Sequence, residues 1–274
     1  MKLLTCNTHS IIEENYEEKL EYFAQWIADN DYDVIAVQES NQTHDMEKAE
    51  PTEEYISSNE SIIIKKDNHI LNTVKLLNAK GKKYYWVWTP VKIGYDIYDE
   101  GLGLISKYKP LEVKEFYLTE SKSYTNWKVR KILGIKIEIE GKERWFYTVH
   151  TGWWNDSEEY FKNQLVKLNR ELWLEKDEVY LMGDFNNPAE VRDEGYDALV
   201  RSGWYDTYLL AEKKDEGVTV SGLIDGWKEH KNISSMRIDF ILKNNDSPVK
   251  ESKVVFNGKN GKTVSDHFAV EITE

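Results

Sequence analysis

The chain contains short apolar runs that stop at polar residues, and this pattern limits the folds it can adopt. The run ending at Val37 is followed by Gln38 and Glu39, and the run ending at Met182 is followed by Gly183 and Asp184. Short continuous apolar runs are typical of strands that are covered on both faces. Such a chain needs further layers of structure on either side of its sheets.

Amphipathic spacing predicts two helices, over 17–29 and 158–175, with Leu20 and Ile27 on the apolar face of the first. Strands outnumber helices, and a hairpin is expected around Gly141, which favours two packed sheets with outer helices over a doubly wound parallel sheet. No linker or repeat interrupts the sequence, so residues 1–274 are expected to form a single domain. The predicted strands cover 2–6, 32–37, 84–88, 102–106, 128–138, 144–149, 179–182, 238–242, 254–256 and 268–272.

The charge of the chain limits its partners. Lys and Arg total 36 and Asp and Glu total 49, so the net charge is −13. This field repels a polyanion such as nucleic acid on average, which makes a nucleic-acid partner a weaker expectation. The basic cluster of Lys80, Lys82 and Lys83 is expected to be a solvated hairpin turn. No stretch is apolar enough to span a membrane and the one cysteine, Cys6, favours a reducing compartment, so we expect a cytoplasmic protein.

The polar residues at the strand ends are of the types that metal-dependent phosphate chemistry uses. Carboxylates suit Mg²⁺ or Mn²⁺, histidines carry protons near neutral pH, and asparagine donates hydrogen bonds without carrying charge. Strands from separate parts of the chain can bring such residues to one rim of a sandwich. The residues are Asn7, Glu39, His150, Asp184, Asn186, Asp266 and His267.

Several other chemistries lack their sequence signatures. The chain has no Cys pair or His-x-x-x-His for zinc, no P-loop, and no Gly-x-Ser-x-Gly elbow. Taken singly, the strand-end residues have plainer explanations: Asp184 suits a turn, and Asp239, inside an apolar strand, could pair with Arg237. Taken together, those explanations require nearly all of these residues to fall at strand ends by chance.

Six segments resemble, in order, the motif set of the endonuclease/exonuclease/phosphatase superfamily, which has the DNase I-like fold. The resemblance runs from Asn7 to His267 and implies an α+β protein, a four-layer αββα sandwich of two mixed sheets flanked by helices. The chain departs from the common pattern at Leu102-Gly103, where the family often has Asn-Ala or Leu-Ala. The segments are Gln38-Glu39-Ser40, Glu100-Gly101-Leu102-Gly103-Leu104-Ile105-Ser106, Thr148-Val149-His150-Thr151, Gly183-Asp184-Phe185-Asn186, Arg237-Ile238-Asp239-Phe240-Ile241-Leu242 and Ser265-Asp266-His267.

The resemblance also implies a metal site and a base. Glu39 would be the main ligand of a Mg²⁺ or Mn²⁺ ion, with help from Asn7 and Asp266. Asp184 would orient or deprotonate the attacking water. The expected activity is therefore hydrolysis of a phosphoester with a metal ion.

The remaining motif residues would act on the phosphate. Asn186 and His150 would hold its oxygens, with Glu100 orienting His150. Asp239 would pair with His267, which would be a general base or a phosphate contact. An acid behind each histidine fixes the tautomer of its ring.

Aromatic residues close to these motifs are candidates for substrate binding. Trp153 and Trp154 follow His150, Tyr95 precedes Glu100, and Trp127 lies ahead of Arg130. Aromatic faces stack on sugar rings, although core packing is the plainer role for any single one of them. We therefore expect Trp153, Trp154, Tyr95, Trp127 and Arg130 to contact the substrate.

A local resemblance narrows the expected substrate. Residues 93–101, with His9-Ser10 and residues 13–15, are similar to a bacterial subgroup of the superfamily that includes maltose 6′-phosphate phosphatase. This implies a cytoplasmic phosphomonoesterase acting on a phosphorylated sugar such as maltose 6′-phosphate. Two alternatives stay open: a nuclease of the same fold, and a non-catalytic member that only binds a phosphorylated ligand.

Overall fold

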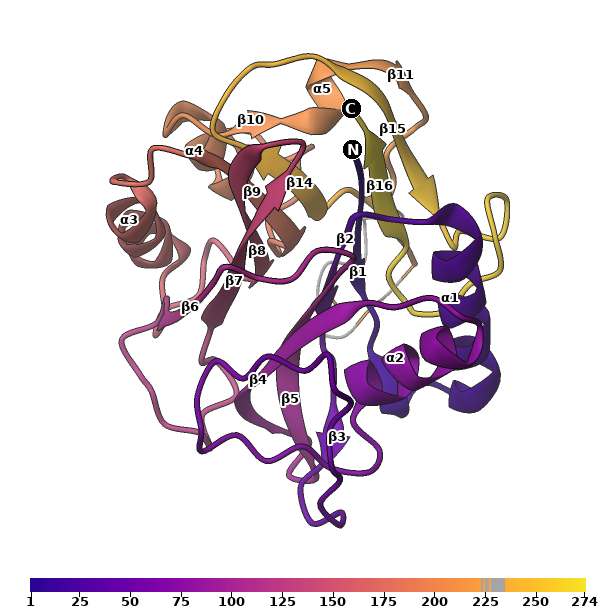
Figure 1. Ribbon diagram of the computed structural model, residues 1–274. Helices are drawn as coiled ribbons and strands as arrows, with labels where there is room; N and C mark the ends of the chain where they lie inside the picture. Colours follow the sequence, from indigo (N-terminus) through magenta and orange to yellow (C-terminus); the bar gives the residue numbers. More distant parts are fainter. Residues whose placement is uncertain (223, 225–226, 228–234) are drawn as a thin grey trace.

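Two mixed β-sheets form the centre of the molecule (Figure 1). The computed structural model describes residues 1–222, 224, 227 and 235–274. Within this part of the chain, the first sheet has the order β11 (Ala211–Lys214), β15 (Val249–Val255), β16 (Ala269–Thr273), β1 (Lys2–Asn7), β2 (Val34–Gln38), β5 (Tyr98–Ser106) and β3 (Gln42–Thr43), and β4 (Tyr85–Gly94) also pairs with β5. The second has the order β10 (Tyr205–Asp206), β14 (Asp239–Lys243), β9 (Glu178–Asp184), β8 (Lys142–His150), β7 (Lys131–Ile139) and β6 (Glu112–Tyr117).

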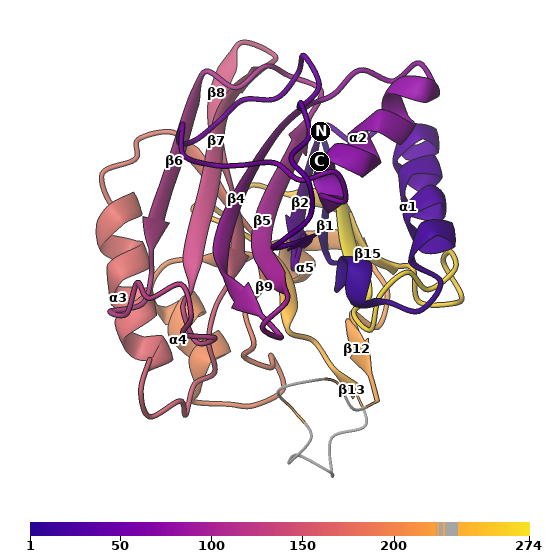
Figure 2. The ribbon, with the colours of Figure 1, turned by 90° about the horizontal axis from the view of Figure 1, so that it is seen from below.

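Helices cover the outer face of each sheet, which completes four layers (Figure 2). Helices α1 (Tyr16–Asn30) and α2 (His69–Ala79) pack on the first sheet, and α3 (Phe161–Leu172) and α4 (Gly195–Arg201) pack on the second. The expected αββα sandwich is therefore confirmed. The smaller elements are the 3₁₀ turn η1 (Ser10–Ile12), α5 (Thr207–Leu210) and the ribbon of β12 (Val220–Ser221) and β13 (Ser235–Met236).

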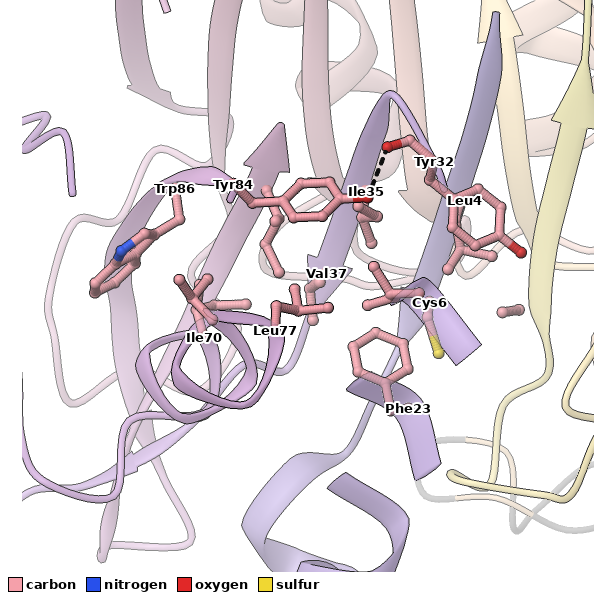
Figure 3. Packing of buried hydrophobic residues seen from close by; sticks show 14 of the residues in the cluster. Leu4, Cys6, Phe23, Tyr32, Ile35, Val37, Ile70, Leu77, Tyr84 and Trp86 are labelled. Atoms are coloured by element: carbon pink, nitrogen blue, oxygen red, sulfur yellow. Dashed lines mark hydrogen bonds between the residues drawn. The ribbon is translucent and has the colours of Figure 1, made fainter. Parts of the chain in front are cut away.

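Alternation along the strands supplies the apolar residues of these layers. Leu3 packs between the two sheets, whereas its neighbour Leu4 packs under α1 and α2. Burying an aliphatic side chain of this size contributes about 1.5–3 kcal/mol. Figure 3 shows the core under the helices, where the Tyr84 hydroxyl donates to the Tyr32 carbonyl oxygen over 3.2 Å. The continuous apolar runs are thus explained by sheets that are covered on both faces.

Both ends of the chain lie in the first sheet. Strand β16 lies between β15 and β1, antiparallel to both. The amino group of Met1 donates to the Glu274 carbonyl oxygen over 3.1 Å. Strand β1 in turn runs parallel to β2, so the first and last strands lie beside the strand that precedes Glu39.

Gly103 of β5 allows α2 to approach the first sheet closely. A Cβ atom at Gly103 would lie 2.5 Å from Cδ1 of Ile70, which is closer than such carbon atoms approach one another. The position that departs from the common family pattern therefore needs a very small residue in this chain.

Several predicted elements differ from the observed ones. Strand β4 continues to Gly94 and β5 begins at Tyr98, so both strands are longer than predicted, and together they form a hairpin. Helix α3 begins at Phe161, later than predicted. The preceding residues form a turn instead, because the Asp156 side chain accepts hydrogen bonds from the backbone nitrogens of Glu158 and Glu159. The predicted hairpin turn at residues 80–83 is wrong: this segment connects α2 to β4. The sequence analysis also missed α2 itself and the edge strand β6.

None of the helices in the described residues is long and apolar enough to cross a membrane.

Candidate active site

Two pairs of parallel strands bring the motif residues to one rim of the sandwich. Asn7 is opposite Gln38 at the ends of β1 and β2, and His150 is opposite Asp184 at the ends of β8 and β9. Carboxyl ends of neighbouring parallel strands lie at the same edge of a sheet, which is a common place for active sites. The antiparallel strand β14 adds Asp239, which is opposite Asp184.

A buried glutamine joins the two sheets directly beneath this rim. The Gln38 side chain donates to Thr148 Oγ1 over 2.8 Å and to the Met182 carbonyl oxygen over 3.3 Å. Its own oxygen accepts from Thr5 Oγ1 over 3.3 Å. A buried amide with its hydrogen bonds made fixes geometry, because losing one of them would leave a polar group unsatisfied. Gln38 thus fixes the spacing between the two halves of the site.

Several residues at this rim, Glu39 and Asn186 among them, have left-handed backbone conformations. Glu39 has φ of 47° and Asn186 has φ of 49°, values that residues other than glycine adopt uncommonly. Each follows the end of a strand, and the turn directs its side chain toward the rim. Backbone strain of this kind costs about 1–3 kcal/mol and is often found at functional sites.

A cleft of about 390 Å³ opens at this rim, a size that suits a small ligand. All the predicted site residues line it except Asn7, Asp239 and Trp154. Asn7 and Asp239 lie behind the lining residues, and Trp154 packs elsewhere. The cleft is lined by His9, Glu39, Lys92, Gly94, Tyr95, Glu100, Trp127, Arg130, His150, Trp153, Asp184, Asn186, Asp266 and His267.

One group of lining residues, which we call the acidic wall, consists of Glu39, Asp184, Asp266, His150 and His267. The Asn7 amide lies behind it and donates to Glu39 Oε1 over 2.9 Å and to Asp184 Oδ2 over 3.1 Å. Its hydrogen bonds thus hold the two carboxylates beside each other.

His267 stands between two acids. Its Nδ1 lies 3.0 Å from Asp239 Oδ2, and its Nε2 lies 3.8 Å from Asp184 Oδ2. Burial alone would lower the pKa of His267, but attraction to Asp239 and Asp184 raises it to about 10. The ring is therefore a cation at neutral pH and can donate a proton or a hydrogen bond into the cleft.

His150 has the opposite electrostatic environment. Its Nδ1 lies 4.0 Å from Glu100 Oε1 and its Nε2 lies 3.6 Å from Asp184 Oδ2. Burial lowers the pKa of His150 strongly, and the positive charges of Arg130 and Lys92 lower it further. A neutral His150 and a charged His267 therefore flank the same carboxylate, Asp184.

Asn186 is held on both sides. Its amide nitrogen donates to the Thr151 carbonyl oxygen over 3.0 Å, and its oxygen accepts from the Trp227 indole over 3.2 Å. Its backbone nitrogen donates to Asp184 Oδ1 over 2.8 Å. One amide hydrogen of Asn186 remains for a ligand in the cleft.

The acidic wall has the composition of a cation site. Glu39, His150 and Asp184 present ligand atoms within 4.8 Å of one another, as do His9, Glu13 and Asp266. Burial raises the pKa of Glu39, and the charge of Glu100 adds to this effect. Burial likewise raises the pKa of Asp184, to about 7, against the opposing attraction of His267. A divalent cation would compensate these buried carboxylates, so the residues fit a metal with oxygen ligands.

A second group of lining residues, which we call the basic–aromatic wall, consists of Lys92, Arg130, Trp127, Trp153 and Tyr95. The Arg130 guanidinium lies 5.3 Å from the centre of the Trp153 ring, and the Trp127 and Trp153 rings lie 5.9 Å apart. Trp127 is 56% exposed and Tyr95 is 55% exposed. This wall offers positive charge near the acids and apolar faces toward solvent.

Trp154 points away from the cleft. It packs against the core of the second sheet, where its ring lies 6.1 Å from that of Phe161 and Lys162 Nζ lies 4.6 Å from the centre of its ring. Trp154 therefore does not line the cleft, whereas its neighbour Trp153 does.

Three cleft residues, Gly94, Lys92 and His9, had no predicted role. Lys92 lies in the part of β4 that was not predicted as a strand, and its one sequence signal is a charge within an otherwise apolar stretch. His9 was noted only for its resemblance to a subgroup; its Nδ1 lies 2.8 Å from Glu13, and its Nε2 is buried without a hydrogen-bond partner among the described residues.

Comparison with known proteins identifies relatives over the whole chain. A sequence model of the endonuclease/exonuclease/phosphatase family matches residues 4–267. A solved structure of an endonuclease/exonuclease/phosphatase family protein from Leptotrichia buccalis C-1013-b is 37% identical, with a TM-score of 0.87 over 100% of this chain and 98% of that one. No protein with curated annotation matches significantly.

Two more distant structures share the fold. The mannosyl-6-phosphatase of Bacteroides thetaiotaomicron VPI-5482 is 17% identical, with a TM-score of 0.67 over 99% of this chain and 98% of that one. D. rerio TDP2 in complex with a single-strand DNA product is 15% identical, with a TM-score of 0.61 over 99% of this chain and 97% of that one. At these identities the likeness is one of fold alone.

Proposed function

This chain belongs to the endonuclease/exonuclease/phosphatase family, and we propose that it is a Mg²⁺- or Mn²⁺-dependent phosphomonoesterase that acts on a phosphorylated sugar. Members of the family are generally hydrolases of phosphoesters. One observation carries the proposal: a single cleft combines buried carboxylates and two differently charged histidines with a wall of arginine, lysine and tryptophan.

The proposed mechanism assigns the proton transfer to Asp184. Its raised pKa suits a general base near neutral pH, and it accepts a proton from the water that attacks phosphorus. The new bond joins the water oxygen to phosphorus, the ester P–O bond breaks, and the departing sugar oxygen takes a proton from solvent. His150, on the other side of Asp184, orients the water through its neutral ring.

The donors around the phosphate stabilise the negative charge of the transition state. The His267 cation donates from Nε2, with Asp239 holding Nδ1, and Asn186 donates from its amide. Glu39, with Asn7 and Asp266, would hold the divalent cation, which supplies Lewis acidity at the phosphate oxygens. Donors fixed before the reaction need no reorganisation when charge develops.

The basic–aromatic wall supports a sugar as the alcohol part of the substrate. Trp153 and Trp127 present ring faces beside the residues that would hold the phosphate. Such faces stack on sugar rings, and the net charge of −13 tolerates a small dianion better than a long polyanion. Maltose 6′-phosphate is the first substrate to test. The name of one protein with the same fold, a mannosyl-6-phosphatase, also indicates a sugar phosphate as its substrate.

A nuclease is the second candidate function, because TDP2, which shares the fold, has been crystallised with a DNA product. The exposed tryptophans of the cleft could stack on bases as well as on sugars. The alternative of a binding protein without activity requires the buried acids and histidines to have no catalytic use.

One experiment separates these functions. The purified protein is given Mg²⁺ and either maltose 6′-phosphate, glucose 6-phosphate, a nucleotide or linear DNA at one salt concentration, and kcat/KM is measured for each. We expect the highest value with a sugar phosphate. A higher value with DNA would contradict the sugar-phosphate proposal, and no phosphate release from any substrate would favour the binding protein.

We also propose that residues 1–274 act as one catalytic domain in the cytoplasm. Both sheets contribute to the cleft, so neither half contains a complete site. Cys6 is buried and free, which supports a reducing compartment. Limited proteolysis should leave one protected fragment that retains the activity.

A further inference from the structure

Arg130 is a buried cation without an anion. The residue is 3% exposed and lines the cleft, and its Nε is buried without a hydrogen-bond partner. Within the described part of the chain its guanidinium forms no ion pair, although Glu100, Asp184 and Glu39 attract it from a distance. A buried guanidinium is normally paired because its desolvation is costly. Its position indicates that a ligand in the cleft supplies the missing negative charge.

The surroundings hold this guanidinium in one orientation. Its Cζ lies 5.3 Å from the centre of the Trp153 ring, a cation–π contact that fixes the plane of the group. The backbone nitrogen of Arg130 donates to Thr119 Oγ1 over 3.1 Å, directly before β7 begins. Arginine offers donors in a rigid fork that matches two oxygens of a phosphate.

Lys92 adds a second buried cation to the same cleft. It is 5% exposed, and its Nζ lies 3.0 Å from Glu100 Oε1. An ammonium group has three donors, so this ion pair leaves others available. The positive charges of Arg130 and Lys92 both lower the pKa of His150. All three side chains line the cleft, so the two cations lie near the position proposed for the phosphate.

We propose that Arg130 and Lys92 form a two-cation clamp that recognises the second negative charge of a phosphate monoester, so that the site selects monoesters over diesters. A monoester has two negative charges above its second pKa of about 6, and three terminal oxygens. A diester has one charge, and an alkyl group replaces one of those oxygens. The inference rests on the proposed phosphomonoesterase function and names the residues that would enforce the preference for monoesters.

The test compares two substrates with the same leaving group. Wild type and variants hydrolyse p-nitrophenyl phosphate and methyl p-nitrophenyl phosphate with Mg²⁺ at about pH 8, where the monoester is a dianion. We expect wild type to prefer the monoester. Arg130→Met should lower kcat/KM for the monoester by about 10- to 100-fold, the worth of one or two charge-assisted hydrogen bonds, and should affect the diester much less. Arg130→Lys should keep part of the preference, and Lys92→Met should reduce it as well.

Matched variants control for the loss of a cation elsewhere. Arg144 pairs with Glu178 at the opposite end of β8, with Nε 2.7 Å from the carboxylate, and Lys131 pairs with Glu115 over 3.3 Å. Neither lines the cleft, so Arg144→Met and Lys131→Met should leave the ratio of the two kcat/KM values unchanged.

Three outcomes decide the inference. Equal losses for both substrates in Arg130→Met would overturn the clamp while the phosphomonoesterase proposal stands, whereas a wild type that prefers the diester would overturn both. If wild type hydrolyses neither substrate, calorimetric titration with inorganic phosphate and with dimethyl phosphate replaces the kinetics. Tighter binding of inorganic phosphate that weakens in Arg130→Met would then support the clamp without the proposed activity, and phosphate binding that is absent or independent of Arg130 would overturn it.

Discussion

The two walls of the cleft differ in how firmly the fold holds them. Residues of the acidic wall lie at the ends of strands, are mostly buried, and are joined by hydrogen bonds such as those from Asn7. The basic–aromatic wall has a buried inner part, Arg130 and Lys92, and an outer part in which Trp127 is 56% exposed. Rigid strand ends suit chemistry, whereas exposed aromatic residues suit recognition. We therefore expect changes in the acidic wall to lower kcat and changes in the outer aromatic residues to raise KM.

Removing the metal should have the largest effect, because it affects every group in the acidic wall. Chelation with EDTA should abolish activity, and Mg²⁺ or Mn²⁺ should restore it. Glu39→Gln should also remove the rise in Tm that the metal gives to the folded protein, since a ligand stabilises only the state that binds it. The exposed Glu21→Gln variant is the control and should keep the rise. Full activity after metal removal would contradict the metal-dependent mechanism.

Substitutions of the reacting groups should come next. Asp184→Asn, His150→Ala and His267→Ala should each lower kcat by roughly 100-fold or more, because each removes a proton acceptor or a donor to the transition state. Asp239→Asn should lose less, since Asp239 acts only through His267. Asp246→Asn, an exposed residue, provides the matched control. A correctly folded His267→Ala enzyme with nearly unchanged kcat would show that this wall does not carry the chemistry.

The pH profile of kcat/KM should show two ionisations in the acidic wall, those of Asp184 and His267. Asp184 must lose its proton to act as base, so kcat/KM should rise with pH through a midpoint at or below about 7, because a bound cation can only lower the pKa of Asp184. His267 must keep its proton, so activity should fall again at or below its pKa of about 10, because the bound cation lowers this pKa as well. In Asp239→Asn the alkaline limb should move to lower pH, because the imidazolium loses an attractive charge. An alkaline limb that does not move would show that His267 is not the group that titrates.

The smallest effect should come from the outer aromatic residues. Trp153→Ala should raise KM for a sugar phosphate by the equivalent of about 1–3 kcal/mol, because stacking stabilises bound substrate and transition state alike. Any further loss in kcat would come from the lost contact with Arg130. Trp154→Ala is the matched control: it should lower Tm because Trp154 packs in the core, and should leave KM unchanged. An unchanged KM in Trp153→Ala for every sugar phosphate would remove the proposed sugar contact.

The acidic wall could be predicted from sequence because its residues follow local signals. Each borders an apolar run, and parallel pairing of the strands brings Asn7 next to the Gln38–Glu39 segment in one sheet and His150 next to Asp184 in the other. The four-layer order was implied by the family resemblance, and the apolar runs agree with it, because strands that are apolar on both faces need cover on both sides. What remained hidden was the contact that joins the sheets, since nothing in the sequence around Gln38 indicates Thr148 as its partner.

The basic–aromatic wall was harder to predict because it depends on the direction of individual side chains. Trp153 and Trp154 are neighbours in a loop, and one lines the cleft while the other packs in the core. No period exists in a loop to decide between two such residues. Lys92 was missed because the strand prediction stopped at residue 88, whereas β4 continues past a shift in its pairing between Pro90 and Lys92.

The position of β16 between β1 and β15 sets the order in which the site can be completed during synthesis. Strand β1 leaves the ribosome first, but its partner β16 and the adjacent His267 follow only after more than two hundred further residues. Contacts so distant in sequence form late, because the intervening chain must first be ordered. The nascent protein therefore holds Asn7 and Glu39 next to an open sheet edge, and the candidate site is complete only after β16 has paired with β1.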